Sequence, residues 1–121
     1  MKELLLQVLA TLGVPVYLQG SIAEDEALPE LYITFLTVDS PSVADFDNAT
    51  ALTAWRYQVS IYGVDPKAVA TKASNARTAL KGAGFIPIGK GRDLPSGEPN
   101  YTAWTCDYYK LENEIGGIKN E

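Results

Sequence analysis

The chain has 121 residues, with 15 acidic and 10 basic side chains, so its formal net charge is −5 at pH 7. It has no histidine and one cysteine, which excludes histidine-based catalytic triads, histidine-ligated metals and an intrachain disulfide. The acidic balance and the lack of a Lys/Arg run argue against a protein that binds nucleic acid by neutralising phosphates. We expect one domain over residues 1–121, with no signal peptide or membrane span and an intracellular location.

The first elements are predicted to be a helix and a short edge strand. Between residues 2 and 12, leucines and a valine recur at helical spacing, and Gly13 favours a helix end. Residues 14–20 are typical of a strand, and Pro15 places it at a sheet edge because proline lacks an amide proton. The acidic residues 21–30 are expected to form a loop.

Two longer strands follow in the prediction. Residues 31–40 (LYITFLTVDS) are apolar on both alternating faces, which favours a central strand. Residues 41–50 are interpreted as a loop. Residues 51–63 alternate most clearly, with period two. The face expected to be buried holds Trp55, Tyr57, Val59 and Ile61, and the wetter face holds Arg56, Gln58, Ser60 and Tyr62.

Asp65-Pro66 predicts the start of a second helix, since aspartate caps a helix and proline suits its first position. Gly82 and Gly84 end this helix. Its apolar stripe consists of Val69, Ala73, Ala76 and Leu80.

Two more strands complete the predicted domain. Residues 85–89 (FIPIG) suggest an edge strand, residues 90–100 a loop, and residues 101–113 a last strand, with residues about 112–121 as a flexible tail. The fold class is α+β: a mostly antiparallel sheet of four to five strands, with two helices on one face and the order α-β-β-β-α-β-β. Residues 53–88 are expected to form a β-α-β unit.

No catalytic, cofactor or metal site is expected. Cys106 shares a strand face with Trp104 and Tyr108, which favours a buried, inert thiol. The glycines of GAGF and GKGRD do not form a phosphate-binding loop. The loop acids lack EF-hand spacing, and no pair of carboxylates is singled out for acid–base chemistry. These acids are Glu24, Asp25, Glu26, Glu30, Asp39, Asp45 and Asp47.

Seven tyrosines and two tryptophans gather mainly in the two long strands. They fit a core with cross-strand pairs, or a protein interface, where such rings offer area and a polar tip. Strand-borne aromatics also stack on single-stranded nucleic acid, which the acidic charge disfavours.

Three segments carry a family resemblance: LYITFLTVDS, TAWRYQVSIYGVDPKAVATKASNARTALKGAGF and GRDLPSGEPNYTAWTCDYYKL. Together they resemble the small tail-completion, or tail-terminator, proteins of long-tailed bacteriophages and prophages. The shared pattern is a strand like YQVSIYG, a helix ending in GF, a loop and an aromatic final strand, across roughly residues 30–111.

The resemblance implies a non-enzymatic virion assembly protein with an α+β fold. Such proteins form a ring, typically a hexamer, that caps the tail tube and joins it to the head connector. The implied partners are further copies of the chain, the tail-tube protein and the head connector, in a virion tail assembled in the host bacterial cytoplasm. Neither nucleic acid nor membrane is an expected partner.

The two longer loops are suitable contact devices for a ring subunit. We expect Phe46 in residues 39–52, and Arg92 and Asp93 in residues 89–100, to contact a neighbouring subunit or the tail tube; alternatively, Phe46 packs on its own core. Other functions left open are a head–tail connector subunit, a ferredoxin-like module that binds a small molecule, and an enzyme that uses carboxylates and tyrosines.

Overall fold

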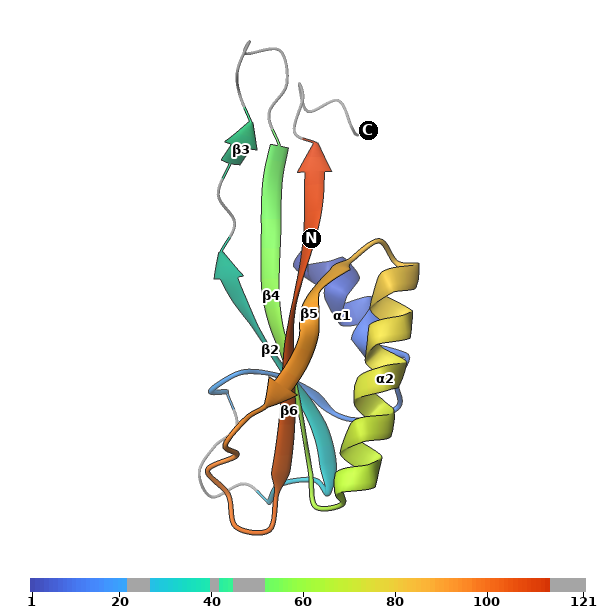
Figure 1. Cartoon of the computed structure of the whole chain (residues 1–121), viewed down its shortest axis with the longest axis vertical. Helices are drawn as coiled ribbons and strands as arrows, with labels where there is room; N and C mark the ends of the chain where they lie inside the picture. Colours follow the sequence, from blue (N-terminus) through green and yellow to red (C-terminus); the bar gives the residue numbers. More distant parts are fainter. Residues whose placement is uncertain (22–26, 40–41, 45–51, 114–121) are drawn as a thin grey trace.

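The computed structural model describes residues 1–21, 27–39, 42–44 and 52–113. Its sheet has the strand order β1-β2-β4-β6-β5, and β3 pairs with β4 off this path (Figure 1). All described pairings are antiparallel except that of β1 with β2. The strands are β1 (Val16–Leu18), β2 (Leu31–Asp39), β3 (Ser42–Ala44), β4 (Leu52–Gly63), β5 (Ile86–Asp93) and β6 (Thr102–Asn113).

Strands β4 and β6 are the centre of the sheet. They pair along their whole lengths, from Leu52 opposite Asn113 to Gly63 opposite Thr102. The predicted inward face of β4 is confirmed: Tyr57 is 0% exposed, Val59 and Ile61 are 2% exposed, and Trp55 is partly buried. One end of both strands extends past the two helices in Figure 1.

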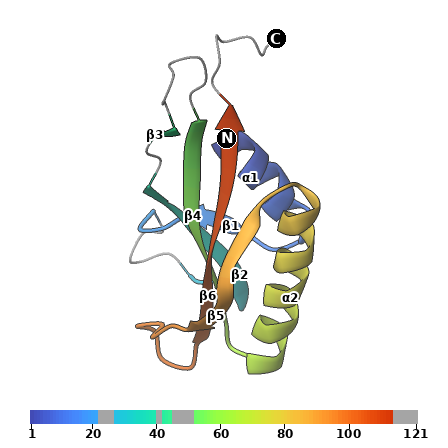
Figure 2. The ribbon, with the colours of Figure 1, turned by 45° about the horizontal axis from the view of Figure 1, so that its top comes forward.

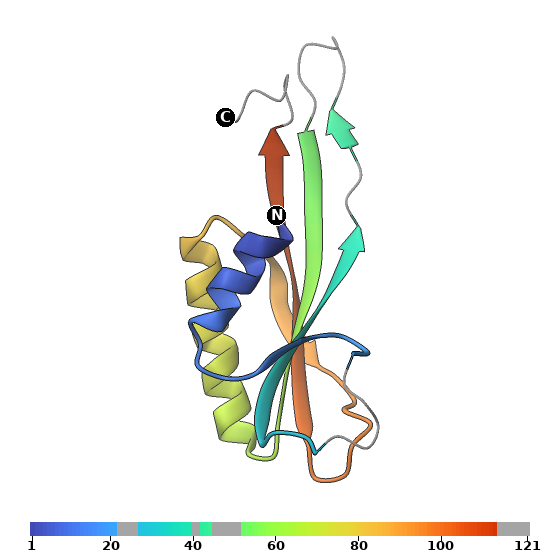
Figure 3. The same ribbon diagram turned by 180° about the vertical axis from the view of Figure 1, so that it is seen from behind.

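Two helices cover one face of the sheet, α1 (Lys2–Ala10) and α2 (Pro66–Gly82) (Figure 3). The Asp65 carboxylate accepts a hydrogen bond from the Lys67 amide at 3.0 Å, so the predicted cap of α2 is confirmed. From the helices, Leu5, Leu9, Val69, Ala76 and Leu80 enter the core.

The connection β4-α2-β5 forms the predicted β-α-β unit, with β6 inserted between its two strands. Strands β4 and β5 are both antiparallel to β6, so they are parallel to each other. Figure 2 shows α2 beside β5, on the same side of the sheet as α1. As predicted, β1 and β5 lie at the two sheet edges and β2 is an inner strand.

Three predictions were wrong in detail. Strand β3 lies inside the predicted loop 41–50. Strand β5 continues to Asp93, because the positive φ angles of Gly89 and Gly91 (77° and 94°) allow an irregular register between Ile88 and Arg92. The second face of β4 is not uniformly wet, since Ser60 is 0% exposed.

Candidate protein-interaction surfaces

The face of the sheet without helices, called the outer face here, carries the even-numbered residues of β4, those of β2 as far as Leu36, and the odd-numbered residues of β6. Beyond Thr37 the register of β2 shifts, so that Asp39 pairs with Arg56. Cross-strand partners point to the same face of a sheet. The register places Leu36 opposite Gln58, Gln58 opposite Asp107, and Asp107 opposite Ile88. These side chains therefore form one row across four strands of the outer face.

A cluster of packed tyrosines lies on one half of the outer face. The Tyr32 and Tyr62 rings stack with centroids 5.0 Å apart, and Tyr17 and Tyr101 approach Tyr32 edge-on at 6.0 and 6.1 Å. The Tyr101 hydroxyl donates a hydrogen bond to the Pro29 carbonyl at 2.8 Å, which joins two loop segments. Three small polar side chains are buried on this face: Thr34, Ser60 and Thr105. This cluster is therefore part of the fold itself.

The other half of the outer face carries exposed aliphatic side chains. Five of the eight large hydrophobic residues that are exposed in the described part of the chain lie on this half or, for Val38, at the irregular register between Thr37 and Asp39 beside it, with exposed fractions between 37% and 48%. Fully covering a large aliphatic side chain is worth about 1.5–3 kcal/mol, so covering the exposed part of each would contribute about 1 kcal/mol. This set, called the outer patch, consists of Leu36, Val38, Ile86, Ile88 and Leu111.

An ion pair lies between the two aliphatic flanks of the outer patch. Arg56 donates to Asp107 Oδ2 from Nη2 at 2.8 Å and from Nε at 3.2 Å. Asp107 Oδ1 is buried, and no donor within the described ranges reaches it. Arg56 itself keeps 44% of its side chain exposed. The patch thus combines apolar area with a partly exposed arginine, a residue type that is enriched at protein interfaces.

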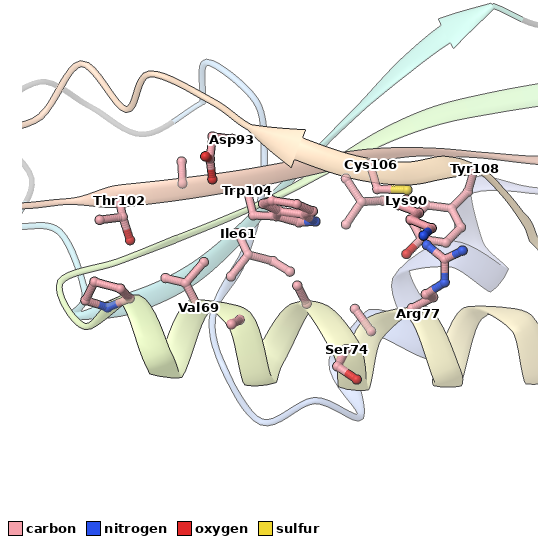
Figure 4. Close-up of a pocket in the computed structure, with 16 residues that line it drawn as sticks. Ile61, Val69, Ser74, Arg77, Lys90, Asp93, Thr102, Trp104, Cys106 and Tyr108 are labelled. Carbon is pink, nitrogen blue, oxygen red and sulfur yellow. The ribbon is translucent and has the colours of Figure 1, made fainter.

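A second surface feature is a groove of about 480 Å³ between α2 and the strands β5 and β6 (Figure 4). Its helix wall is made of small side chains, including Ala70 and Ala73, and its sheet wall of Ile61 and Trp104. Small helical residues leave this space open because they do not reach the sheet. Polar groups stand at its rim: Ser74, Arg77, Lys90, Asp93 and Thr102.

Close packing of β5 on β6 shapes the sheet wall of the groove. A Cβ atom added at Gly91 would collide with the Trp104 indole and would lie 2.9 Å from the Thr105 carbonyl oxygen. Arg77 donates to the Gly89 carbonyl at 3.2 Å, which joins α2 to β5 beside the groove. Gly91 therefore lets the β5 backbone approach Trp104 and leaves the indole in place as a wall.

A chain of a solved structure is similar in fold. It belongs to a structure titled "Virion of native gene transfer agent (GTA) particle", with a TM-score of 0.55 and 14% sequence identity. The similarity covers 90% of the present chain and 91% of that chain. No protein-family model and no curated protein matches the sequence.

Two titratable groups of the groove wall, Cys106 and Tyr108, are buried. Burial raises the pKa of the Cys106 thiol and of the Tyr108 hydroxyl. Cys106 is 5% exposed, as the sequence predicts for an inert thiol. Within the described ranges, no cluster of three or more His, Cys, Asp or Glu side chains could hold a metal ion. In the same part of the chain, no helix has the length and apolar character to cross a membrane.

Of the three residues predicted to make contacts from two loops, the structure describes Arg92 and Asp93. Arg92 and Asp93 are exposed at the end of β5, opposite Thr105 and Trp104 respectively, and Asp93 lines the groove. They are strand residues, not loop residues, because β5 extends to Asp93. Phe46 lies outside the described residues.

Sequence reasoning missed both the outer patch and the groove. The available signals were the exposed pair Ile86 and Ile88 around Pro87, and the run of small residues on α2. Neither signal shows which other strand lies beside it, and that information comes only from the strand order.

Proposed function

We propose that this protein is a non-enzymatic virion assembly protein that forms a ring at the end of a tail tube and joins the tube to the head connector. The observation that carries the proposal is the fold shared, over nine-tenths of both chains, with a chain of a gene transfer agent virion. The resemblance of residues 30–111 to tail terminators supports the same role. The protein would be part of the virion tail and would be assembled in the cytoplasm of the bacterial host.

The outer patch supplies a surface for such a role. Ring subunits need more than one contact surface, because each copy contacts two neighbours and the structures above and below. Covering the five aliphatic side chains would contribute about 5 kcal/mol before the costs of association, which is a useful part of a specific contact. In this proposal the patch binds the tail tube or the connector, and the exposed part of the Arg56 side chain is available to that partner.

Deletion of the gene from the phage or prophage that encodes it tests the proposal. We expect tails of irregular length that do not attach to heads, and wild-type protein supplied from a plasmid should restore uniform, joined tails. Electron microscopy of the particles measures both properties. Normal tails in the deletion strain would refute the proposal.

A head–tail connector subunit is the nearest alternative, and the same deletion separates the two. Loss of a connector leaves tails of normal length that remain detached, whereas loss of a terminator changes tail length.

The groove favours a second candidate, a module that binds a small molecule. Its volume of about 480 Å³ lies within the range of small-ligand sites, which is about 300–1,000 Å³. A thermal-shift screen against amphiphilic metabolites with an acidic group tests this candidate, because a ligand that binds only the native state raises the unfolding temperature. A ligand that raises the unfolding temperature of the wild type but not of Ala70→Glu would favour this function.

A further inference from the structure

Basic side chains are concentrated in one segment of the chain. Residues 66–92, which form α2 and most of β5, carry six of the ten basic residues and no acidic residue. All fifteen acidic residues lie elsewhere, together with only four basic ones. The six basic residues are Lys67, Lys72, Arg77, Lys81, Lys90 and Arg92.

The charges of this segment are not neutralised locally. Among the residues that the structure describes, none of the six forms an ion pair. Two of them bind uncharged backbone carbonyls instead: Lys72 donates to the Leu12 carbonyl at 2.8 Å, and Arg77 to that of Gly89. The segment is therefore positive on a protein whose net charge is negative, and five of its six basic residues lie elsewhere than the outer face, where Arg92 pairs with Thr105.

Two of the six basic residues, Arg77 and Lys90, line the groove, together with one acidic residue, Asp93. Figure 4 shows Arg77 from α2 and Lys90 from β5 close together at one end of the groove, near Tyr108. Most of the remaining wall is apolar, with Val69, Ala73 and Trp104 among its residues. A matching partner therefore offers an apolar side chain with acidic groups beside it.

We infer that the groove and its basic rim bind an acidic surface of a second copy of this chain. The inference rests on the proposed ring, and it names the surface that would join its subunits. A contact between two identical positive surfaces would bring like charges together, so the charge distribution disfavours a two-fold dimer through α2. It favours a head-to-tail contact, which closes into a ring or continues as a filament.

Photo-crosslinking at the groove tests the inference. A photoreactive phenylalanine analogue replaces Ala70, which is an exposed residue of the groove wall, or Asn75, which is exposed on the same helix outside the groove. Equal amounts of ¹⁴N- and ¹⁵N-labelled protein are mixed, so that mass spectrometry distinguishes crosslinks between copies from those within a copy. The reaction is run on the purified protein and on assembled particles.

We expect crosslinks between copies from position 70 and not from position 75. Their yield in the purified protein should fall as salt rises from about 0.05 to about 0.5 M, because the Debye length shortens from about 14 to about 4 Å. Sedimentation velocity gives a second readout. Ala70→Glu should weaken self-association by about tenfold, and Asn75→Glu, with the same added charge, should not.

Several results would overturn the inference: equal yields at both positions, a yield that does not change with salt, or crosslinks confined to one copy. Crosslinks to another virion protein, or the absence of crosslinks in both preparations, would overturn it as well. If the protein is present in particles but position 70 crosslinks a different protein, the inference fails and the proposed function stands. If copies crosslink in solution but the protein is absent from particles, the proposed function fails instead.

Discussion

Gly91→Ala is expected to disturb the wall of the groove, and Gly89→Ala is its matched control. Both glycines lie on β5 with positive φ, at 94° and 77°, so alanine meets similar backbone strain at each. They differ in their surroundings. A Cβ atom at Gly89 would have no heavy atom within 4 Å, whereas one at Gly91 would collide with Trp104 and the Thr105 carbonyl.

The magnitudes follow from this difference. Backbone strain at positive φ costs about 1–2 kcal/mol, offset by about 0.4–1 kcal/mol from the reduced entropy of the unfolded chain. Gly89→Ala should therefore lower the free energy of unfolding by about 1 kcal/mol. Gly91→Ala adds an overpacking term of about 1–3 kcal/mol, since the collision is with backbone and a partly buried ring.

Urea denaturation followed by circular dichroism measures both variants. The difference between them should be about 1–3 kcal/mol, with Gly91→Ala the less stable, or about 4–12 °C in melting temperature for a domain of this size. Tryptophan emission of native Gly91→Ala should also shift, because the Trp104 indole has to move. Equal stabilities within about 0.5 kcal/mol would refute the close approach of β5 to Trp104.

Three further predictions concern the outer patch, the tyrosine cluster and the cysteine. Ile88→Glu should fold normally, because Ile88 is already exposed, and should lower incorporation into particles by about tenfold. Val64→Glu, at a similarly exposed residue outside the outer patch, should be incorporated like the wild type. Equal incorporation of the two variants would contradict a binding role for the outer patch. Burial, with smaller effects from Tyr62 and Tyr101, raises the pKa of Tyr32 to about 12. As the pH rises, the Tyr32 hydroxyl loses its proton first in the unfolded chain, near a pH of about 10. The free energy of unfolding should therefore fall between a pH of about 10 and about 12, and it should fall less steeply in Tyr32→Phe. The same pH profile in the wild type and in Tyr32→Phe would contradict the raised pKa of Tyr32. Cys106 should react with Ellman's reagent far more slowly in the native protein than in urea, and equal rates would show that its thiol is accessible.

Local patterns predicted most of the fold because they rest on local physics. The alternation of residues 51–63 and the Asp65-Pro66 cap each depend on a few neighbouring residues, and both are confirmed. Strand β5 was predicted too short because the glycines of GKGRD are also typical of a turn. Only pairing with β6 makes that segment a strand.

The candidate surfaces could not be predicted because they depend on tertiary structure. Leu36 and Ile88 are far apart in the sequence, and they share a face only because β4 and β6 lie between their strands. Ser60 was expected to be wet, but it donates a hydrogen bond to Thr105 at 2.9 Å on a buried part of the outer face. A period of two identifies the faces of a strand, and it does not show what covers each face.

Electron cryomicroscopy of purified particles tests the central claim most directly. We expect a closed ring of copies of this fold at the head-proximal end of the tail tube, with the groove between α2, β5 and β6 at the boundary between copies. Absence of the protein from the particles, or density for this fold away from the end of the tube, would contradict the proposed role.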